Sequence, residues 1–313
     1  MIRTRVYRVP KSLEGMRADR VLAELVPSLS KTAAGRLCER GSVRVDGRPL
    51  HKGTLVRPGA VVVVDATPSR CAAPDPDTEL QIRYQSDSLV IVNKIAGVPS
   101  APRNGTELGT IANALLARFP EMACVGYGPL EPGLLHRLDT GTSGLLIAAR
   151  TAGAFLDLRD ALQSNAWTKE YLALVREGTL AEVGCFTAPI ATTSRRAARV
   201  TVVEAGCSRQ RPTRSARSAE TRYRVLERRG NVALLTIRAP RAVRHQIRAH
   251  FAAAGSPLVN DVLYGAAPEK GLEKGRFALH AARVAWPGSP TVEAFDVSEP
   301  LADDLTRWFD NLV

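Results

Sequence analysis

The sequence predicts an α+β protein of two unequal domains, and three observations lead to this fold class. Strand-like and helical segments follow one another irregularly, without the regular βαβ order of a parallel sheet. A stretch rich in proline and small residues separates a short N-terminal part from the rest. A chain of 313 residues, 45% of them hydrophobic, can bury a large core. The predicted parts are a domain at 14–66, a linker at 67–79 and a second domain at 80–313.

The N-terminal domain begins with two predicted helices. Val21 and Leu25 lie at helical spacing in the first. Ser30 is suited to cap a second helix that runs through Leu37 and that Gly41 would end. The sequence "SVRVDGRPL" then predicts a hairpin with an Asp-Gly turn, and "PGAVVVVD" predicts a closing strand.

This domain is basic, with 13 Lys and Arg against 6 Asp and Glu in residues 1–65. Its helix–helix–hairpin order resembles the small RNA-binding fold named after ribosomal small-subunit protein four, the alpha-L motif. In that fold two helices carry basic residues onto structured RNA. The resemblance implies RNA contacts from Lys31, Arg36, Arg40 and Arg44. An ordinary solvated helix face is the alternative that the residues leave open.

The second domain mixes strands and helices. Apolar runs and period-2 alternation predict strands, and apolar residues at helical spacing predict helices. The alternation of one strand places Lys169 and Tyr171 on the same face, and the last helix carries an apolar stripe that includes Val243 and Ile247. The predicted strands are 88–94, 144–150, 167–175 and 231–239, and the predicted helices are 151–166 and 243–255.

Composition narrows the function classes. A net charge of +12 and a pI near 10.0 favour a polyanionic partner, because basic side chains release counterions from phosphates. No run approaches the roughly 20 apolar residues of a membrane span, and no apolar secretory segment follows the basic start. We therefore expect nucleic acid as the partner, no membrane association and a cytoplasmic location.

Motifs for metal or nucleotide binding are missing from the sequence. The five cysteines are scattered, and none forms a C-x-x-C pair. The sequence has no G-x-S-x-G elbow, no H-E-x-x-H and no Gly-rich phosphate loop after a strand. We expect no metal site, and the missing nucleotide-binding turn argues against a methyltransferase.

The candidate catalytic residues stand in polar clusters beside apolar runs. In "LLHRLDTGTSGLLIAAR", residues 134–150, Asp139 stands next to a predicted buried strand. Burying a carboxylate costs several kcal/mol unless a partner compensates, so Asp139 needs a partner or a chemical role. Capping of the following turn is the structural alternative.

The segment "HRLDTGTSGLL" resembles the signature of the RluA-type pseudouridine synthases, H-R-L-D, two variable residues and T-S-G-L. Four further segments resemble motifs of that family in the same order: "DSLVIVNKIAGV", "TKEYLALV", "RHQIRAHFAAAGSPLVNDVLYG" and "FALHA". The resemblance covers roughly residues 80–285. It implies a catalytic domain with a long mixed, mostly antiparallel sheet and a central cleft, which converts uridine in RNA to pseudouridine without a cofactor.

The resemblance also implies the roles of individual residues. Asp139 would be the catalytic carboxylate, Arg248 would keep it ionised, and Tyr171 would stack on the uracil and move a proton. Arg137 would fill the space that the flipped base leaves. Further substrate contacts are implied or weighed for Leu138, Lys169 and Ile247. The histidines at 136, 245 and 250 are interpreted as structural hydrogen-bonding residues.

Some positions depart from the family pattern or stay open. Ala242-Val243 replaces a usual Gly-Arg pair, Ile95 a usual proline and Asn260 a usual glycine. Residues 192–217 hold seven Arg and one Glu, which fits either a solvated loop or an arm that folds onto RNA. A non-catalytic RNA-binding or ribosome-assembly protein with the same fold is the alternative function. We expect a monomer that acts on ribosomal RNA, with transfer RNA as the second choice.

Overall fold

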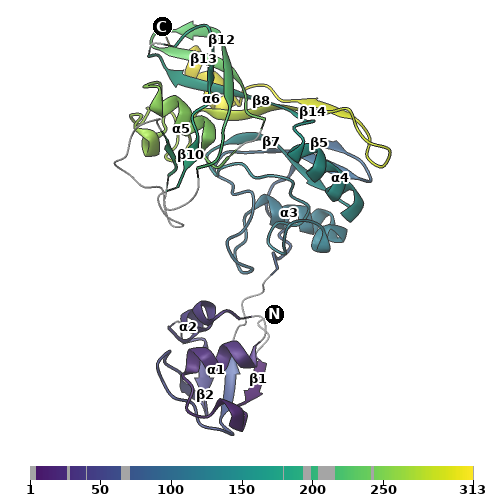
Figure 1. Ribbon diagram of the computed structural model, residues 1–313, viewed down its shortest axis with the longest axis vertical. Coiled ribbons are helices and arrows are strands. Elements are labelled where there is room, and N and C mark those ends of the chain that lie inside the picture. Colours follow the sequence, from purple (N-terminus) through teal and green to yellow (C-terminus); the bar gives the residue numbers. More distant parts are fainter. Residues whose placement is uncertain are drawn as a thin grey trace. The chain divides into compact units, whose positions relative to one another are not determined.

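The computed structural model describes residues 5–26, 29–39, 41–64, 71–178, 180–192, 199–203, 216–240 and 243–312. Two compact units make up most of the chain, residues 1–71 and residues 72–103 with 107–313 (Figure 1). Among the described residues, no helix combines the length and the apolar character needed to cross a bilayer.

The N-terminal unit is a four-stranded antiparallel sheet covered by two helices. Its core includes Val21 and Leu22 of α1 and Leu37 of α2. The Ser30 hydroxyl accepts the Ala33 N–H at 3.2 Å, which confirms the predicted cap. The sheet order is β1-β4-β2-β3, and the elements are β1 (Arg5–Arg8), η1 (Lys11–Leu13), α1 (Ala18–Leu25), α2 (Lys31–Glu39), β2 (Val43–Val45), β3 (Arg48–Pro49) and β4 (Val61–Val64).

The second unit is built on one nine-stranded mixed sheet in the order β5-β6-β7-β14-β8-β13-β12-β9, with β15 paired to β14. Only the β7–β14 pair is parallel among the described strands, which confirms the mostly antiparallel sheet. The strands are β5 (Gln81–Gln85), β6 (Leu89–Lys94), β7 (Ser143–Ala149), β8 (Thr168–Arg176), β9 (Val183–Phe186), β12 (Thr221–Arg229), β13 (Val232–Arg238), β14 (Leu279–Trp286) and β15 (Phe295–Ser298).

Helices and short elements complete this unit. A two-stranded ribbon pairs β10 (Ile190–Ala191) with β11 (Thr201–Val202). The helices are α3 (Ile111–Arg118), α4 (Ala152–Gln163), α5 (Gln246–Ala253) and α6 (Asp303–Asp310), and the 3-10 turns are η2 (Pro120–Cys124) and η3 (Val262–Tyr264).

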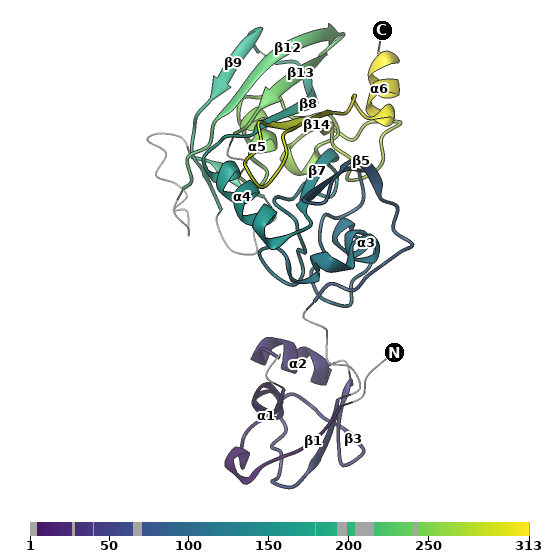
Figure 2. The same cartoon turned by 90° about the vertical axis from the view of Figure 1, so that its right-hand side faces the viewer.

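Strand β7 is buried on both faces. Leu146 and Ala148 belong to one core cluster with α3, while Leu145 and Ile147 belong to another with α4. Figure 2 shows α3 and α4 to either side of β7. Because both faces are covered, the strand reads as a continuous apolar run, which explains why the sequence predicted it.

The sheet is narrowest where β7 meets β14. Only two residue pairs join them, Ser143 with His280 and Gly144 with Ala281. Gly144 has φ +108°, and a Cβ there would lie 2.3 Å from the Ala281 carbonyl oxygen, so this position requires glycine. The loop that precedes β7 therefore lies where the two halves of the sheet meet in close backbone contact.

Two boundaries differ from the sequence expectations. The predicted helix at 243–255 begins only at Gln246, because His245 adopts φ +54° and interrupts helical geometry before it; Val243 precedes the helix. Residues from Ala72 onward, which we assigned to the linker, hydrogen-bond to the second unit: Ala72 N–H donates to the Pro129 carbonyl at 2.8 Å. We therefore propose a linker that ends at Cys71.

Candidate active site

The second unit contains a cavity of about 1380 Å³ beside the loop that precedes β7. This volume exceeds the 300–1,000 Å³ typical of small-ligand pockets, so it can hold more than one nucleotide. Its charged lining is almost entirely basic, with Asp139 as the one carboxylate among the described lining residues. The basic lining residues are Arg137, Lys169, Arg217, Arg244 and Arg248. The cavity is suited to a polyanion.

The backbone on both sides of Asp139 is held by buried polar side chains. The Ser100 hydroxyl accepts the Leu138 N–H at 3.0 Å and donates to the Leu138 carbonyl at 2.9 Å. Lys94, fully buried, donates to the carbonyl oxygens of Ile95, Val98 and Thr140 at 2.8–3.2 Å. These bonds fix the backbone on both sides of Asp139 to buried side chains.

Arg276 supports the same loop from the segment before β14. It is 4% exposed and donates to the Gly141 carbonyl at 2.9 Å and to the Ser143 hydroxyl at 3.0 Å. Its charge is paired with Asp304 of α6 at 2.6 Å. Burial of the guanidinium is therefore compensated by a carboxylate and by loop acceptors.

Asp139, whose side chain is 28% exposed, forms an ion pair with the buried Arg248 of α5. Arg248 Nη1 donates to Asp139 Oδ2 at 2.9 Å, and its Nε and Nη2 donate to the two oxygens of Asp261 at 2.7 and 2.8 Å. Burial acts to lower the pKa of Arg248, but the Asp261 and Asp139 carboxylates outweigh it and raise the pKa. Arg248 therefore stays charged and places a positive group against Asp139 Oδ2.

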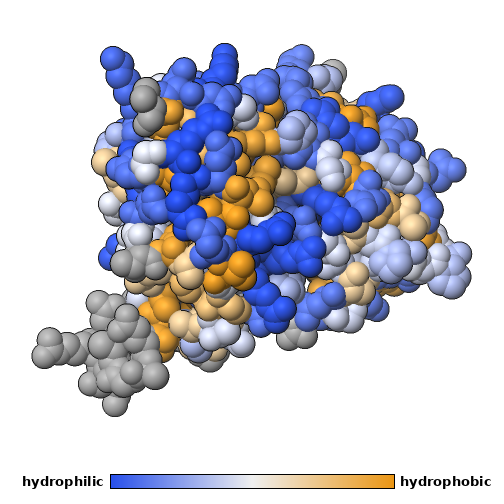
Figure 3. All heavy atoms as spheres, turned by 90° about the horizontal axis from the view of Figure 1, so that it is seen from above, coloured by the Kyte–Doolittle hydropathy of each residue, from blue (hydrophilic) through white to orange (hydrophobic). Residues whose placement is uncertain are grey.

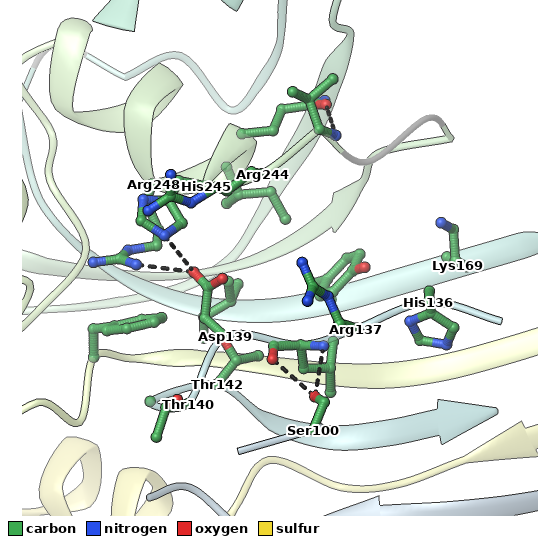
Figure 4. A pocket seen from close by; sticks show the side chains of 18 of the residues that line it. Ser100, His136, Arg137, Asp139, Thr140, Thr142, Lys169, Arg244, His245 and Arg248 are labelled. Carbon is green, nitrogen blue, oxygen red and sulfur yellow. Dashed lines mark hydrogen bonds and ion pairs between the residues drawn. The ribbon is translucent and has the colours of Figure 1, made fainter. Parts of the chain in front are cut away.

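His245 approaches the same oxygen of Asp139. Its Nε2 lies 3.6 Å from Asp139 Oδ2, and its Nδ1 lies 3.1 Å from the Tyr264 hydroxyl (Figure 4). Burial lowers the pKa of His245, which favours the neutral imidazole. Both contacts of Asp139 thus converge on Oδ2, and Oδ1 has no hydrogen-bond partner among the described residues. The carboxylate presents one oxygen to the cavity.

Tyr171 on β8 lines the cavity from the sheet side. It is 6% exposed, and burial together with the nearby Asp139 charge raises its pKa to about 12. The phenol is therefore neutral at physiological pH. Its hydroxyl makes no hydrogen bond to the described residues, so it is available to a bound ligand.

Lys169 lies two residues earlier on the same strand face, as the alternation predicts. It is 7% exposed, and burial lowers its pKa to about 8. Figure 4 shows it near His136, on the far side of Arg137 from Asp139. Burial and the Lys169 charge lower the pKa of His136 to about 3, so this histidine is neutral. Lys169 has no ion-pair partner in the described part of the chain.

Replacing Lys169 with methionine is expected to raise the free energy of unfolding by about 1–3 kcal/mol at pH 7, because the buried charge is removed. The folded pKa of about 8 lies below the unfolded value of 10.5. The unfolded state therefore binds more protons between these values, and the wild type gains stability as the pH rises. The advantage of the variant should shrink from pH 8 to 10.5.

Urea denaturation at pH 7 and pH 10 measures this difference through tryptophan fluorescence. All three tryptophans, Trp167, Trp286 and Trp308, belong to the second unit. The exposed Lys274→Met is the matched control and should change stability by less than about 0.5 kcal/mol. A gain at Lys169 that is absent, or equal at both pH values, contradicts the prediction.

The remaining predicted cavity residues divide by exposure. Arg137 is 64% exposed and pairs with Glu131 at 2.9 Å. Leu138 and Ile247 are buried, with exposed fractions of 8% and 5%. Both belong to the main core and also line the cavity. They are therefore core residues with one face toward the site.

The predicted RNA-contacting side chains lie on the N-terminal unit. Lys31, Arg36 and Arg44 are exposed, while Arg40 lies outside the described residues. In the arginine-rich segment 192–217, residues 193–198 and 204–215 also lie outside them, as does Ala242. The RNA-binding roles of these residues therefore stay predictions.

Several supporting residues were not identified from the sequence. Lys94, Ser100 and Arg276 hold the loop through contacts distant in the chain, and Asp261 holds Arg248. Asn260, which replaces the usual glycine, has φ +63°, a conformation that Asn tolerates better than most residues. Its side chain also donates to the Glu273 carbonyl at 3.0 Å. The departure therefore preserves the turn before Asp261.

Comparison with known proteins agrees with this geometry. A family model described as RNA pseudouridylate synthase matches residues 88–253, and an S4 domain model matches residues 16–62. "Uncharacterized RNA pseudouridine synthase" of Chloroflexus aurantiacus is 38% identical over 309 residues, covering 96% of this chain and 91% of the relative. "Ribosomal large subunit pseudouridine synthase D" of Xanthomonas campestris is 33% identical, covering 96% and 89%.

Solved structures give the same result. "Human RNA Pseudouridylate Synthase Domain Containing 1" has a TM-score of 0.56 and 26% identity, and the match covers 72% of this chain and 85% of the human one. The α+β fold with a large mixed sheet, predicted from the motif order, is confirmed.

Proposed function

This chain belongs to the RNA pseudouridylate synthase family, and from that premise we propose that it isomerises specific uridines of large-subunit ribosomal RNA with Asp139 as the nucleophile. The ribosomal substrate is favoured because relatives such as the Xanthomonas campestris protein carry that name. We further propose that it acts as a cytoplasmic monomer.

One observation carries the assignment of Asp139. It is the only carboxylate among the described lining residues of a basic cavity, and one of its oxygens is held by Arg248 while the other faces the cavity unpaired in the described structure. A nucleophile needs to be ionised, close and oriented. The Arg248 guanidinium places a positive charge against the carboxylate, and the bonds to Leu138, Thr140 and Gly141 orient it.

The reaction exchanges one bond to the ribose for another. The N1–C1′ glycosidic bond breaks, the uracil turns, and C5 bonds to C1′. The hydrogen on C5 then leaves as a proton and N1 takes up a proton, so there is no net redox change. Asp139 serves either route to bond cleavage, attack on the ribose or removal of a ribose proton to give a glycal. The Tyr171 hydroxyl, neutral and unpaired among the described residues, is suited to relay the C5 proton.

The remaining cavity residues bind the substrate in this proposal. Leu138 and Ile247 form apolar walls for the uracil, and Lys169 attracts a phosphate into the part of the cavity near His136. Arg137 would occupy the space left by the flipped base, and to do so it must leave Glu131. An exposed ion pair of this kind contributes at most about 1 kcal/mol, so RNA can replace it.

The N-terminal unit supplies general RNA affinity through Lys31, Arg36, Arg40 and Arg44. Removal of residues 1–71 is expected to weaken RNA binding and to reduce the slope of log Kd against log salt, since each lost phosphate contact contributes about 0.9 to that slope for duplexes. Filter binding at 50–200 mM salt measures both. An unchanged slope would contradict the role, and the separate core of the second unit lets the truncated chain be tested.

Tritium release tests the reaction itself. Large-subunit ribosomal RNA transcribed with [5-³H]uridine should lose tritium to water when the full chain is added, because C5 gives up its hydrogen. Carbodiimide-dependent reverse-transcription stops in RNA from cells with and without the protein then locate the uridine. Binding of RNA with neither tritium release nor a mapped stop would favour the alternative of a non-catalytic ribosome-assembly protein.

A further inference from the structure

Two large apolar side chains are exposed beside the cavity. Val262 is 60% exposed and Leu263 is 39% exposed, both on the 3-10 turn η3 (Val262–Tyr264). Leu263 also lines the cavity that holds Asp139. Figure 3 shows a mostly hydrophilic surface in which apolar side chains gather in limited patches. The position of this exposed pair at the cavity, more than its size, raises the question of what contacts it.

The turn that carries them is anchored at both ends to the catalytic cluster. Asp261, before Val262, is 1% exposed and accepts two hydrogen bonds from Arg248. Tyr264, after Leu263, bonds to His245 and accepts the Val200 N–H at 3.0 Å, and the Arg248 guanidinium lies 5.0 Å from the centre of its ring. The two apolar side chains are thus presented at a defined place relative to Asp139.

Chemistry on a base in structured RNA requires that the base leave its stack. Proteins that open a stack insert apolar side chains between neighbouring bases, where they replace part of the lost stacking. The basic lining of the cavity brings the RNA backbone to this rim. Arg137, the residue suited to the vacated space, is paired with Glu131 in the structure.

We propose that Val262 and Leu263 form an apolar wedge that contacts the bases flanking the target uridine and keeps their stack open while the uridine lies at Asp139. The occupant is a base step of RNA, chosen because the exposed pair continues into a cavity of opposite charge to the RNA backbone. This inference rests on the proposed function, because it presumes that an RNA uridine enters the cavity.

The test compares two variants that make the same change at similar exposure. Val262→Ser alters the wedge next to the cavity-lining Leu263, and Val183→Ser alters a residue of 65% exposure on the edge strand β9. The double variant Val262→Ser/Leu263→Ser removes the whole wedge. The substrate is a stem-loop transcript that carries the mapped uridine, and a short unstructured oligonucleotide of the same sequence serves as the second substrate.

The double variant is expected to lower kcat/KM on the stem-loop by about 5- to 100-fold, the range of one lost base contact. The loss on the unstructured oligonucleotide should be less than threefold, because no stack has to be opened. Val183→Ser should match the wild type on both. With 2-aminopurine next to the target uridine, the fluorescence rise on binding, which reports unstacking, should be several-fold smaller for the double variant.

The outcomes separate this inference from the proposed function. If the wild type releases no tritium from either RNA, the proposed function fails. If the wild type is active and the wedge variants match Val183→Ser, the wedge is wrong. Equal losses on both substrates also overturn it, since they indicate a disturbed site. Should the double variant fail to fold, the exposed Val262→Ser alone decides between these results.

Discussion

Replacing Asp139 with asparagine is expected to abolish tritium release from RNA, with a fall in kcat of at least about 10³-fold. The amide keeps the shape of the side chain but is a poor nucleophile and cannot take up a ribose proton as a carboxylate can. The Leu138, Thr140 and Gly141 bonds that hold the loop do not involve this side chain. Arg248 keeps its bidentate pair with Asp261. The variant should therefore fold and bind RNA.

Single-turnover tritium release and filter binding measure the two effects separately. Asp160→Asn on α4 is the matched control, since its side chain is 65% exposed and does not line the cavity. It should retain wild-type activity within about twofold. If Asp139→Asn keeps more than a tenth of the wild-type rate, the nucleophile has been assigned wrongly. If it loses RNA binding in parallel with activity, Asp139 orients the substrate instead.

Strands and helices with a clear apolar period could be predicted from the sequence, while others could not. The continuous apolar run of β7 and the alternating exposure of side chains along β8 predict buried strands. By contrast, β12 carries four arginines, and a bulge between Val225 and Glu227 breaks its alternation. The first strand of the chain, β1, has exposed Val6 and was also missed. Pairing with neighbouring strands stabilises both segments, and a local pattern does not show it.

Only the site residues that stand in recognisable sequence motifs could be predicted. Asp139, Tyr171, Arg248 and Lys169 were named from the sequence, and the structure places them in one cavity. The Arg248–Asp139 contact, across 109 positions, was implied only by the family resemblance, and the Arg276–Gly141 contact, across 135 positions, was not predicted. Such pairs depend on how the sheet brings distant segments together.

The neutral state of His136 could not be predicted from the sequence either. Its pKa is lowered to about 3 first by burial and then by the charge of Lys169. Neither burial nor this neighbour can be read from a histidine that stands in a motif. The structure supports the interpretation of His136 as a hydrogen-bonding residue, since its Nε2 accepts the Ile147 N–H at 3.3 Å.

Replacing Asp261 with asparagine is expected to lower the free energy of unfolding of the second unit by about 3–5 kcal/mol. Asp261 is 1% exposed and is the bidentate partner of Arg248, which is itself 5% exposed. The amide accepts only through one oxygen and carries no charge, so the guanidinium would remain buried with Asp139 as its single counter-charge. Stability falls because the buried guanidinium loses its bidentate carboxylate and keeps only the partly exposed Asp139 as a charged partner.

Urea denaturation followed by tryptophan fluorescence measures the loss, and Asp296→Asn is the matched control. Asp296 pairs with Arg283 at 2.7 Å, but the side chains are 56% and 35% exposed, so solvent screens the pair. Its removal should cost less than about 1 kcal/mol. Equal losses in both variants would show that burial does not govern the Arg248–Asp261 contact. A large loss for Asp261→Asn alone would show that this buried carboxylate stabilises the second unit through its contact with Arg248.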